Sequence, residues 1–253
     1  ILTTLSLADS GTARVCGLDV VKDYQQIRSE IGYMPGHFAL YQDLSVEENL
    51  NFYATIFGTT VAENYGTIKE IYSQIGMFKD RRARDLSGGM KQKLALCCAL
   101  VHKPEVLLLD EPTTGVDAVS RREFWEMLNR IKESGVTIMV STPYMDEVSR
   151  CDRVAMILDG KIIGQGTPAE IVARYPDRLY SASGENMFEI LGILRHVDGV
   201  LNCSSFGSEC HVSVAQDGPD ETVLAKSLED AGISSCTVKR ISPGIEDCFI
   251  RLS

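Results

Sequence analysis

Residues 105–112 constrain the fold more than any other part of this sequence. Four apolar residues, 106–109, have the length of a strand buried on both faces, and two adjacent acids, Asp110 and Glu111, follow directly. Such strands belong to parallel sheets whose faces are covered by helices. Because ligand sites of these sheets lie at the carboxyl ends of the strands, we expect a site at Asp110 and Glu111.

Other apolar segments have a similar length, and helical patterns separate most of them. Buried strands are expected around Val15 and at residues 31–34, 136–140 and 154–158. Continuous apolar strands that alternate with helices are typical of an α/β domain with a largely parallel sheet. We therefore predict the α/β class for the first part of the chain.

Two local signals predict the boundaries of elements. Ser45 and Glu48 have the spacing of a capping box, which predicts a helix that runs to about Ile56. Asp159-Gly160 separates two apolar segments and is typical of the two-residue turn of a β-hairpin. Residues 1–5 have the pattern of a helix interior without a cap, so we expect that an N-terminal part is missing.

The composition changes near residue 180. The small and polar residues 180–184 predict a linker. Residues 180–253 carry 11 acidic and 5 basic side chains, which account for −6 of the total charge of −10. Their pattern of a helix, two strands, a helix, a strand and a short helix predicts a small α+β domain.

Charge and hydropathy argue against two classes of protein. A formal charge of −10 opposes nucleic-acid binding through a basic face, since phosphate contacts need clustered Lys and Arg. The longest apolar run, residues 94–101, is far shorter than the roughly 20 residues that span a bilayer. If the protein works at a membrane, we expect another chain to supply the membrane-spanning part.

The cysteines indicate a reducing compartment. The eight cysteines form no CxxC pair, and the sequence has no recognisable secretion signal, so free thiols are expected. Cys203, Cys210 and His211 have no spacing typical of a zinc site, and we interpret them as strand residues.

Asp110 and Glu111 are expected to have different tasks, because neighbouring strand residues point to opposite faces of a sheet. One carboxylate can hold a hard cation such as Mg²⁺, directly or through water. The other can orient and deprotonate a water molecule for attack on phosphorus. Two acids that only end a strand are the alternative interpretation.

A second candidate site lies at residues 86–92, where the sequence reads LSGGMKQ. Ser87 is a favourable helix N-cap, and Gly88 and Gly89 allow a ligand to approach the backbone closely. The N–H groups and positive dipole end of the following helix attract phosphate. An ordinary N-cap before a buried helix explains the same residues.

Together these motifs resemble the ATP-binding-cassette (ABC) ATPases. LSGGMKQ, VLLLDEP at 106–112 and TTGVD at 113–117 stand in the order and spacing of that family's signature motif, Walker B strand and D-loop. The resemblance covers roughly residues 1–175. It implies a P-loop NTPase-like, mostly parallel sheet in a domain of residues 1–179, with a helical subdomain at about 40–86, and a separate acidic domain of residues 180–253.

The resemblance also implies a role for each matching residue. In this family two cassettes pair head to tail, and each ATP lies between one phosphate loop and the partner's signature motif. Asp110 would then coordinate Mg²⁺ through water, and Glu111 would be the general base. The residues expected to contact nucleotide are Ser87, Gly88, Gly89, Gln92 and Asp117, the last of which would reach across the dimer.

Several family features are missing from this sequence. Residues 1–253 contain no phosphate loop of the form GxxxxGK[ST] and no matching adenine-stacking aromatic. Gly36 stands where the family has a glutamine, and Pro143 where it has a switch histidine. Glycine has no side-chain amide, and proline has neither an imidazole nor an N–H group. His37 could substitute in part for the glutamine, although a solvated loop histidine is the simpler interpretation.

The expected function is that of an ATP hydrolase that energises a membrane exporter. Its partners would be an integral membrane permease and a second cassette, and it would be peripheral on the cytoplasmic face of the membrane. The apolar patterns of residues 36–76 resemble the helices that dock a permease, and residues 241–250 resemble the C-terminal extension of exporter-type cassettes. The alternatives are a regulatory or structural cassette with little hydrolysis, and an ABC ATPase outside transport.

Overall fold

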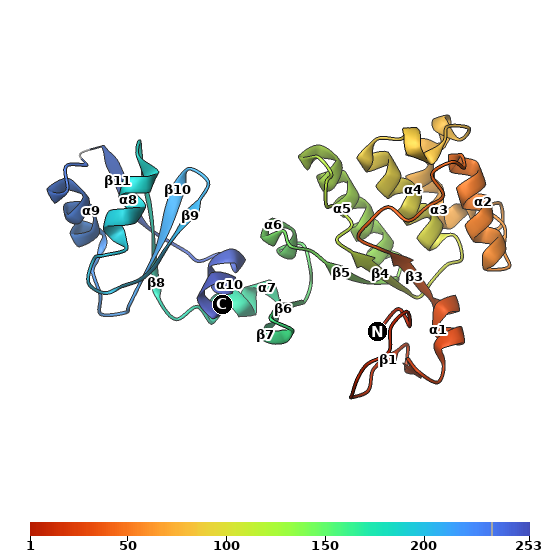
Figure 1. Ribbon diagram of the computed structural model, residues 1–253, viewed down its shortest axis with the longest axis horizontal. Helices are drawn as coiled ribbons and strands as arrows, with labels where there is room; N and C mark the ends of the chain where they lie inside the picture. The colour runs from red at the N-terminus through yellow and green to blue at the C-terminus, as the bar shows by residue number, and fades with distance from the viewer. Residues whose placement is uncertain (234) are drawn as a thin grey trace. The chain divides into compact units, whose positions relative to one another are not determined.

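The computed structural model describes residues 1–233 and 235–253. They form two compact units, residues 1–143 and residues 144–253 (Figure 1). The domain boundary expected at residues 179/180 stays a prediction. Among the described residues, no helix has both the length and the apolar character needed to cross a membrane.

A three-stranded parallel sheet organises the first unit. The strands are β3 (Ile31–Met34), β4 (Val106–Asp110) and β5 (Thr137–Ser141), in the order β3-β4-β5. Leu107, Leu108 and Leu109 of the central strand are between 0% and 7% exposed. The predicted parallel sheet with a buried central strand is therefore confirmed.

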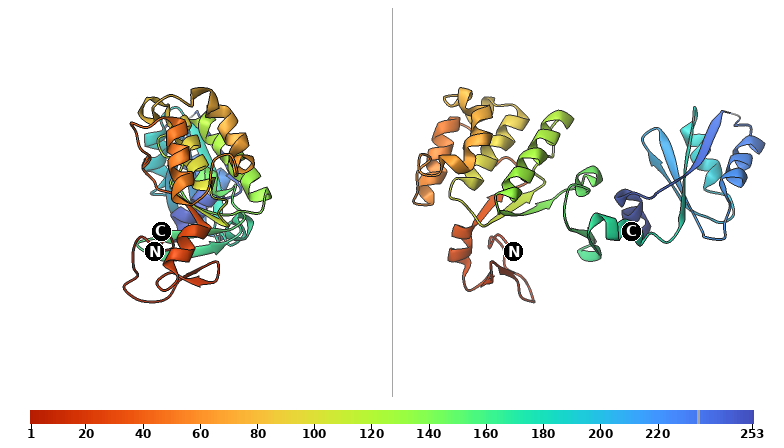
Figure 2. Two further views of the ribbon diagram at one scale, coloured as in Figure 1. Left: turned by 90° about the vertical axis from the view of Figure 1, so that its right-hand side faces the viewer. Right: turned by 180° about the vertical axis from the view of Figure 1, so that it is seen from behind.

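Helices cover both faces of this sheet (Figures 1 and 2). On one face lie α2 (Val46–Ile56), α3 (Tyr65–Ile75), α4 (Gly88–Leu100) and α5 (Ala118–Glu133), with the short helices η1 (Gly76–Phe78) and η2 (Ala83–Asp85) between α3 and α4. On the other face lie α1 (Tyr24–Glu30) and the small hairpin of β1 (Arg14–Val15) and β2 (Leu18–Asp19). Val15, Ile27 and Leu108 join these last elements to the sheet in one buried cluster.

The capping box at the start of α2 is present as predicted. The Ser45 hydroxyl accepts from Glu48 N at 3.1 Å, and Ser45 N donates to Glu48 Oε2 at 2.7 Å. These bonds satisfy backbone N–H groups that a helix start leaves without partners. The buried Asn49 then fixes the preceding loop, because its amide donates to the carbonyl oxygens of Tyr41, Leu44 and Ser45.

The helical pattern expected at residues 1–5 was wrong. These residues form a turn, in which Thr4 N donates to Ile1 O at 2.9 Å, and Thr4 has a φ of 60°. The left-handed conformation of a non-glycine residue is incompatible with a continuing α-helix. Arg28 of α1 holds the turn by donating to the Thr4 hydroxyl and carbonyl oxygens.

The second unit begins with α6 (Met145–Val148) and the predicted hairpin, and α7 (Pro168–Ala173) follows. The strands β6 (Val154–Leu158) and β7 (Lys161–Gly166) pair antiparallel. Asp159 and Gly160 between them have φ angles of 47° and 74°. Two consecutive positive φ angles are the requirement of a type I′ turn, so the Asp-Gly signal is confirmed.

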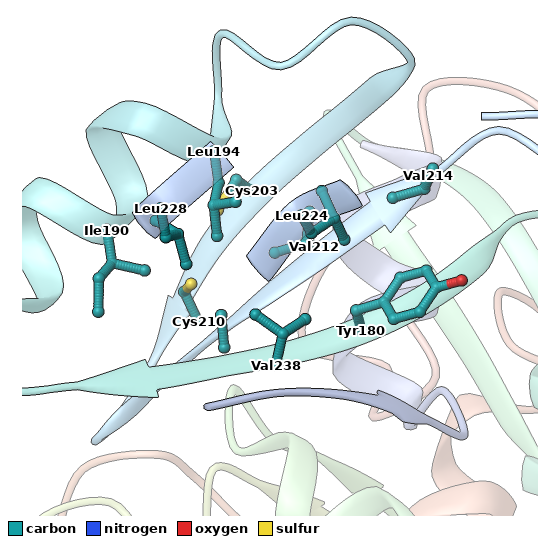
Figure 3. Packing of buried hydrophobic residues seen from close by; sticks show 11 residues of the cluster. Tyr180, Ile190, Leu194, Cys203, Cys210, Val212, Val214, Leu224, Leu228 and Val238 are labelled. Atoms are coloured by element: carbon teal, nitrogen blue, oxygen red, sulfur yellow. The ribbon is translucent and has the colours of Figure 1, made fainter. Parts of the chain in front are cut away.

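A four-stranded antiparallel sheet with helices α8 and α9 follows, as the α+β pattern predicted. Its strand order is β11-β8-β10-β9. Buried residues of the sheet and both helices meet in one core, where Cys203 and Cys210 are fully buried strand residues (Figure 3). The elements are β8 (Arg178–Gly184), α8 (Met187–Leu194), β9 (Val200–Phe206), β10 (Glu209–Val214), α9 (Glu221–Asp230), β11 (Cys236–Ile241) and α10 (Ile245–Leu252).

The linker expected at residues 180–184 was wrong, because these residues belong to the inner strand β8. Ala182 is 0% exposed and pairs with Cys210 on one side and Val238 on the other. Ser181 is also buried, and its hydroxyl donates to the Glu209 carboxylate. Small residues occur here because the strand passes through the packed core, which leaves little room for larger side chains.

We predict that Ala182→Leu destabilises the protein by about 1–3 kcal/mol, because added methyl groups overpack a filled core. Urea denaturation followed by circular dichroism measures the change. The matched control is Glu185→Leu at an exposed position just after β8. Equal unfolding midpoints for the two variants would contradict the assignment of β8 to the core.

Candidate functional site

The two acids after the central strand are held by the neighbouring strand. Asp110 pairs with Ser141 in the register of β4 and β5. The Ser141 hydroxyl donates to Asp110 Oδ1 at 2.5 Å, and Glu111 N donates to the Ser141 hydroxyl and carbonyl oxygens at 3.1 and 3.0 Å. Both acids are exposed at the carboxyl edge of the sheet, where the sequence predicts a site.

Glu111 marks a sharp change in the direction of the chain. Its φ is 45°, a conformation that side-chain-bearing residues adopt rarely and that concentrates at functional sites. The Thr114 hydroxyl donates to Glu111 Oε2 at 3.0 Å, and Thr114 N donates to Glu111 O at 3.1 Å. The two carboxylates therefore have different partners, Ser141 for Asp110 and Thr114 for Glu111.

Asp117 has a structural task in this structure. Its carboxylate caps α5 by accepting from Val119 N at 3.1 Å and from Ser120 N at 3.0 Å. The hydrogen bond from the Ser120 backbone is the largest cause that lowers the pKa of Asp117. The Asp117 side chain is exposed despite this cap. Its expected contact across a dimer stays a prediction.

The LSGG residues lie at the start of α4. The Ser87 hydroxyl accepts from Met90 N at 3.4 Å, which confirms the predicted N-cap. Ser87 and Gly88 are exposed, as a ligand contact would require. Gln92, one turn further along α4, lines a narrow crevice with Gly89 and Thr113.

The two signature glycines pack against the segment that follows Glu111. A Cβ atom on Gly89 would lie 2.9 Å from the Ser120 hydroxyl oxygen and 3.0 Å from its Cβ. A Cβ on Gly88 would lie 3.7 Å from the Gly115 carbonyl oxygen, which is an ordinary contact. The motif predicts that both glycines allow a ligand to approach, and the structure shows that Gly89 also allows α4 and α5 to meet.

The loop after β3 brings residue 36 to the acids. A Cβ on Gly36 would lie 3.2 Å from Asp110 O and 3.5 Å from Asp110 Oδ2. A longer side chain at this position would therefore start next to the Asp110 carboxylate. Pro143 stands two residues after Ser141 and is exposed, as is His37.

The sequence motifs do not predict the contacts of three residues at this site, which are Ser141, Thr114 and Ser120. Ser141 was detectable in principle, because a polar residue at the end of a strand beside Asp110 reaches the same sheet edge. Tyr33 of β3 lies close enough to Asp110 for an electrostatic effect. The pKa of Tyr33 is raised mainly by burial and to a smaller extent by the charge of Asp110. Thr114 and Ser120 give no comparable signal, because their contacts depend on the turn after Glu111.

This arrangement defines a class of protein. Carboxylates at the carboxyl edge of a parallel sheet, beside the start of a glycine-led helix, are typical of nucleotide-binding α/β proteins. A family model described as "ABC transporter" matches residues 1–114. The chain belongs to the family of ABC transporter ATP-binding proteins, and the expected resemblance is confirmed.

Two curated relatives support this membership. The chain is 36% identical over 256 residues to the "Probable multidrug ABC transporter ATP-binding protein YbhF" of Escherichia coli (strain K12), an alignment that covers 99% of this chain and 43% of YbhF. It is 31% identical over 255 residues to the "Linearmycin resistance ATP-binding protein LnrL" of Bacillus subtilis (strain 168), covering 97% of this chain and 81% of LnrL. The chain thus spans less than half the length of YbhF.

A solved structure confirms the fold. The structure titled "Structure of ATP binding subunit of ABC transporter" superposes with a TM-score of 0.62 at 25% identity, covering 69% of this chain and 74% of that chain. The P-loop NTPase-like fold that the sequence predicts is therefore confirmed.

We predict that Gly89→Ala destabilises the first unit by about 1–3 kcal/mol, because its Cβ would overlap Ser120. Gly88→Ala is the matched control and should be tolerated. Urea unfolding followed by the fluorescence of Trp125, the one tryptophan of the sequence, measures both.

Ser120→Gly should reduce the cost of Gly89→Ala in a double-mutant cycle, with a coupling of at least about 0.5 kcal/mol. Additive effects of the two substitutions would show that the glycine does not pack on Ser120.

Proposed function

We propose that this chain is an ATP-binding subunit that couples ATP binding and hydrolysis to export through a membrane permease. The observation that carries the proposal is the junction at which Ser141 holds Asp110 and the Glu111 backbone, beside the exposed start of α4. Relatives named for multidrug transport and linearmycin resistance support the export direction.

The proposal includes the partners and the location of the protein. The membrane-spanning part would come from a permease, and the second cassette would be identical, separate or fused. The protein would be peripheral on the cytoplasmic face of the membrane, and nucleic acid is not a proposed partner. An ABC ATPase outside transport is the alternative. Purification with a membrane protein supports export, whereas purification with ribosomes or DNA supports the alternative.

The residues at the sheet edge fit Mg²⁺ and a hydrolytic water molecule. Asp110 offers an exposed carboxylate, the type of ligand that Mg²⁺ prefers. Glu111 is also exposed, and its backbone is fixed by Ser141, so its carboxylate can accept a proton from a water molecule. Bound Mg²⁺ would neutralise charge that develops on transferred phosphate oxygens.

The start of α4 fits the other side of an ATP site. Ser87, Gly88 and Gly89 present a hydroxyl and backbone at a helix N-terminus, which favours a phosphate group. Gln92 and Asp117 would add contacts from the same surface. Residues 1–253 contain no GxxxxGK[ST] loop, so the residues present account for the proposed metal-binding and signature parts of an ATP site and not for its phosphate loop.

Hydrolysis at the site that contains Glu111 would be slow, or this site would be the weaker half of an asymmetric pair. Gly36 adjoins Asp110 but offers no amide to Mg²⁺ or water. Pro143, just past the end of β5, offers no imidazole. A regulatory or structural cassette with little hydrolysis of its own would have the same two residues.

We predict that Gly36→Gln combined with Pro143→His raises the ATPase rate of the assembled transporter by about 10-fold or more, because positioned polar groups of this kind contribute large factors. The matched control, Gly36→Leu with Pro143→Leu, fills the same space without polar groups and should give no increase. Position 36 accommodates a side chain longer than glycine only if Asp110 moves by a few tenths of an ångström.

The Glu111→Gln variant of the otherwise unchanged transporter also tests whether hydrolysis at this site is slow. A moderate loss of ATPase turnover is expected if a second site supplies most of it. Loss of nearly all turnover would show that this site is the principal catalytic one and would overturn the slow-site hypothesis.

A further inference from the structure

The two acids at the sheet edge differ in how their side chains are held. Ser141 of the neighbouring strand donates to Asp110, whereas Glu111 Oε2 accepts from the Thr114 hydroxyl at 3.0 Å. Among residues 1–233 and 235–253, the Glu111 carboxylate forms no ion pair, and its second oxygen, Oε1, accepts no hydrogen bond. One oxygen of the proposed base is therefore held, and the other is available.

The backbone of Glu111 is held on both sides of its Cα atom. Its N–H group donates to the hydroxyl and carbonyl oxygens of Ser141, and its carbonyl oxygen accepts from Thr114 N at 3.1 Å. These bonds impose the φ of 45°, since such a conformation persists only where its surroundings determine it. The freedom that remains lies in the side chain of Glu111.

That freedom matters for a general base. A glutamate side chain has several rotatable bonds, and a base must lie within about 2.6–3.2 Å of the water molecule that it deprotonates. Thr114 is suited to restrict the side chain, because threonine is β-branched and its hydroxyl has few χ1 rotamers to choose from. The hydrogen bond from Thr114 thus limits the orientations of the Glu111 carboxylate.

Core packing gives no separate reason for Thr114. The residue is exposed, as are Glu111 and Gly115, whereas the neighbouring Thr113 is only 1% exposed. Substitutions at exposed positions usually change stability little. An effect of Thr114 on turnover can therefore be separated from an effect on folding.

We infer that Thr114 is a positioning residue for Glu111. Its hydroxyl holds Oε2, which leaves Oε1 to accept the proton of the water molecule that attacks phosphorus. The proton passes from that water molecule to Oε1, and the Thr114 hydroxyl keeps its own proton. The inference rests on the proposed function, because it requires Glu111 to be the base.

The test is the Glu111-dependent turnover, which is the ATPase turnover of a transporter minus that of the same transporter with Glu111→Gln. Thr114→Val keeps the shape of threonine without its hydroxyl and should lower this turnover about 3- to 10-fold, the range of one hydrogen bond. The KM for ATP should change by less than about 2-fold, because Thr114 acts through Glu111 and not on binding. Thr114→Ser keeps a hydroxyl and should retain most of the turnover.

The matched control is Thr137→Val, at an exposed threonine that begins β5 at the other edge of the sheet, and it should change nothing. The double variant Glu111→Gln with Thr114→Val should have the same turnover as Glu111→Gln alone. A further loss in the double variant would show that Thr114 acts elsewhere or on folding, and the inference would be wrong.

Two other outcomes separate the inference from the proposed function. Turnover that falls with Glu111→Gln but not with Thr114→Val would overturn the inference and leave the proposed base in place. Turnover that is unchanged by Glu111→Gln would show that the proposed base is wrong, and the inference would fail with it.

A spectroscopic measurement checks the hydrogen bond without ATP. Three-bond NMR couplings of the Thr114 methyl carbon report its χ1 angle in the full chain. One rotamer is expected in the unmodified protein, and averaging over rotamers is expected in Glu111→Ala, which lacks the acceptor. The couplings of Thr137 should be the same in both proteins. Thr114 couplings that stay unchanged in Glu111→Ala would contradict the inference, because another group would then hold the hydroxyl.

Discussion

The site depends on one side chain, the hydroxyl of Ser141. It donates to the carboxylate that ends β4 and accepts from the N–H of Glu111, so it joins two strands and fixes the point where the chain turns. The parallel register of β4 and β5 sets Ser141 opposite Asp110, and the buried apolar residues of β4 fix that strand in the core. Core packing and site geometry are thus linked through a single residue.

The second constraint is the close approach of α4 and α5. Gly89 lies where any larger residue would overlap Ser120, and Ser120 donates its N–H to the Asp117 cap. The start of α4 and the segment after Glu111 therefore form one surface, although Gly88 and Gly115 are 27 residues apart in the sequence and Gly89 and Ser120 are 31 apart. The two helices can approach this closely because Gly89 has no side chain.

The sequence predicted what depends on local pattern. The apolar run of β4, the capping box of α2 and the Asp-Gly turn of β6 and β7 each have a signal within a few residues, and each is present. It failed where packing between distant segments decides the structure. Ala182 in small, polar surroundings resembles a linker residue until Cys210 and Val238 are known to flank it, and the tasks of Thr114 and Ser120 exist only once the turn at Glu111 has formed.

Helix α5 connects the two edges of the sheet. Asp117 caps the start of this helix and Ser120 lies in its first turn, both at the candidate site. Arg130 and Ile131 in its last turns line a cavity of about 570 Å³ at the amino-terminal ends of the strands. Its 16 residues make a rod of about 24 Å. A helix that reaches both edges of the sheet does not by itself couple them energetically. A ligand shifts a conformational equilibrium only by the difference between its affinities for the two states. An occupant of the cavity would therefore act on the nucleotide site only if α5 has two positions between which the cavity changes shape. A single arrangement of the first unit would leave the two edges of the sheet independent.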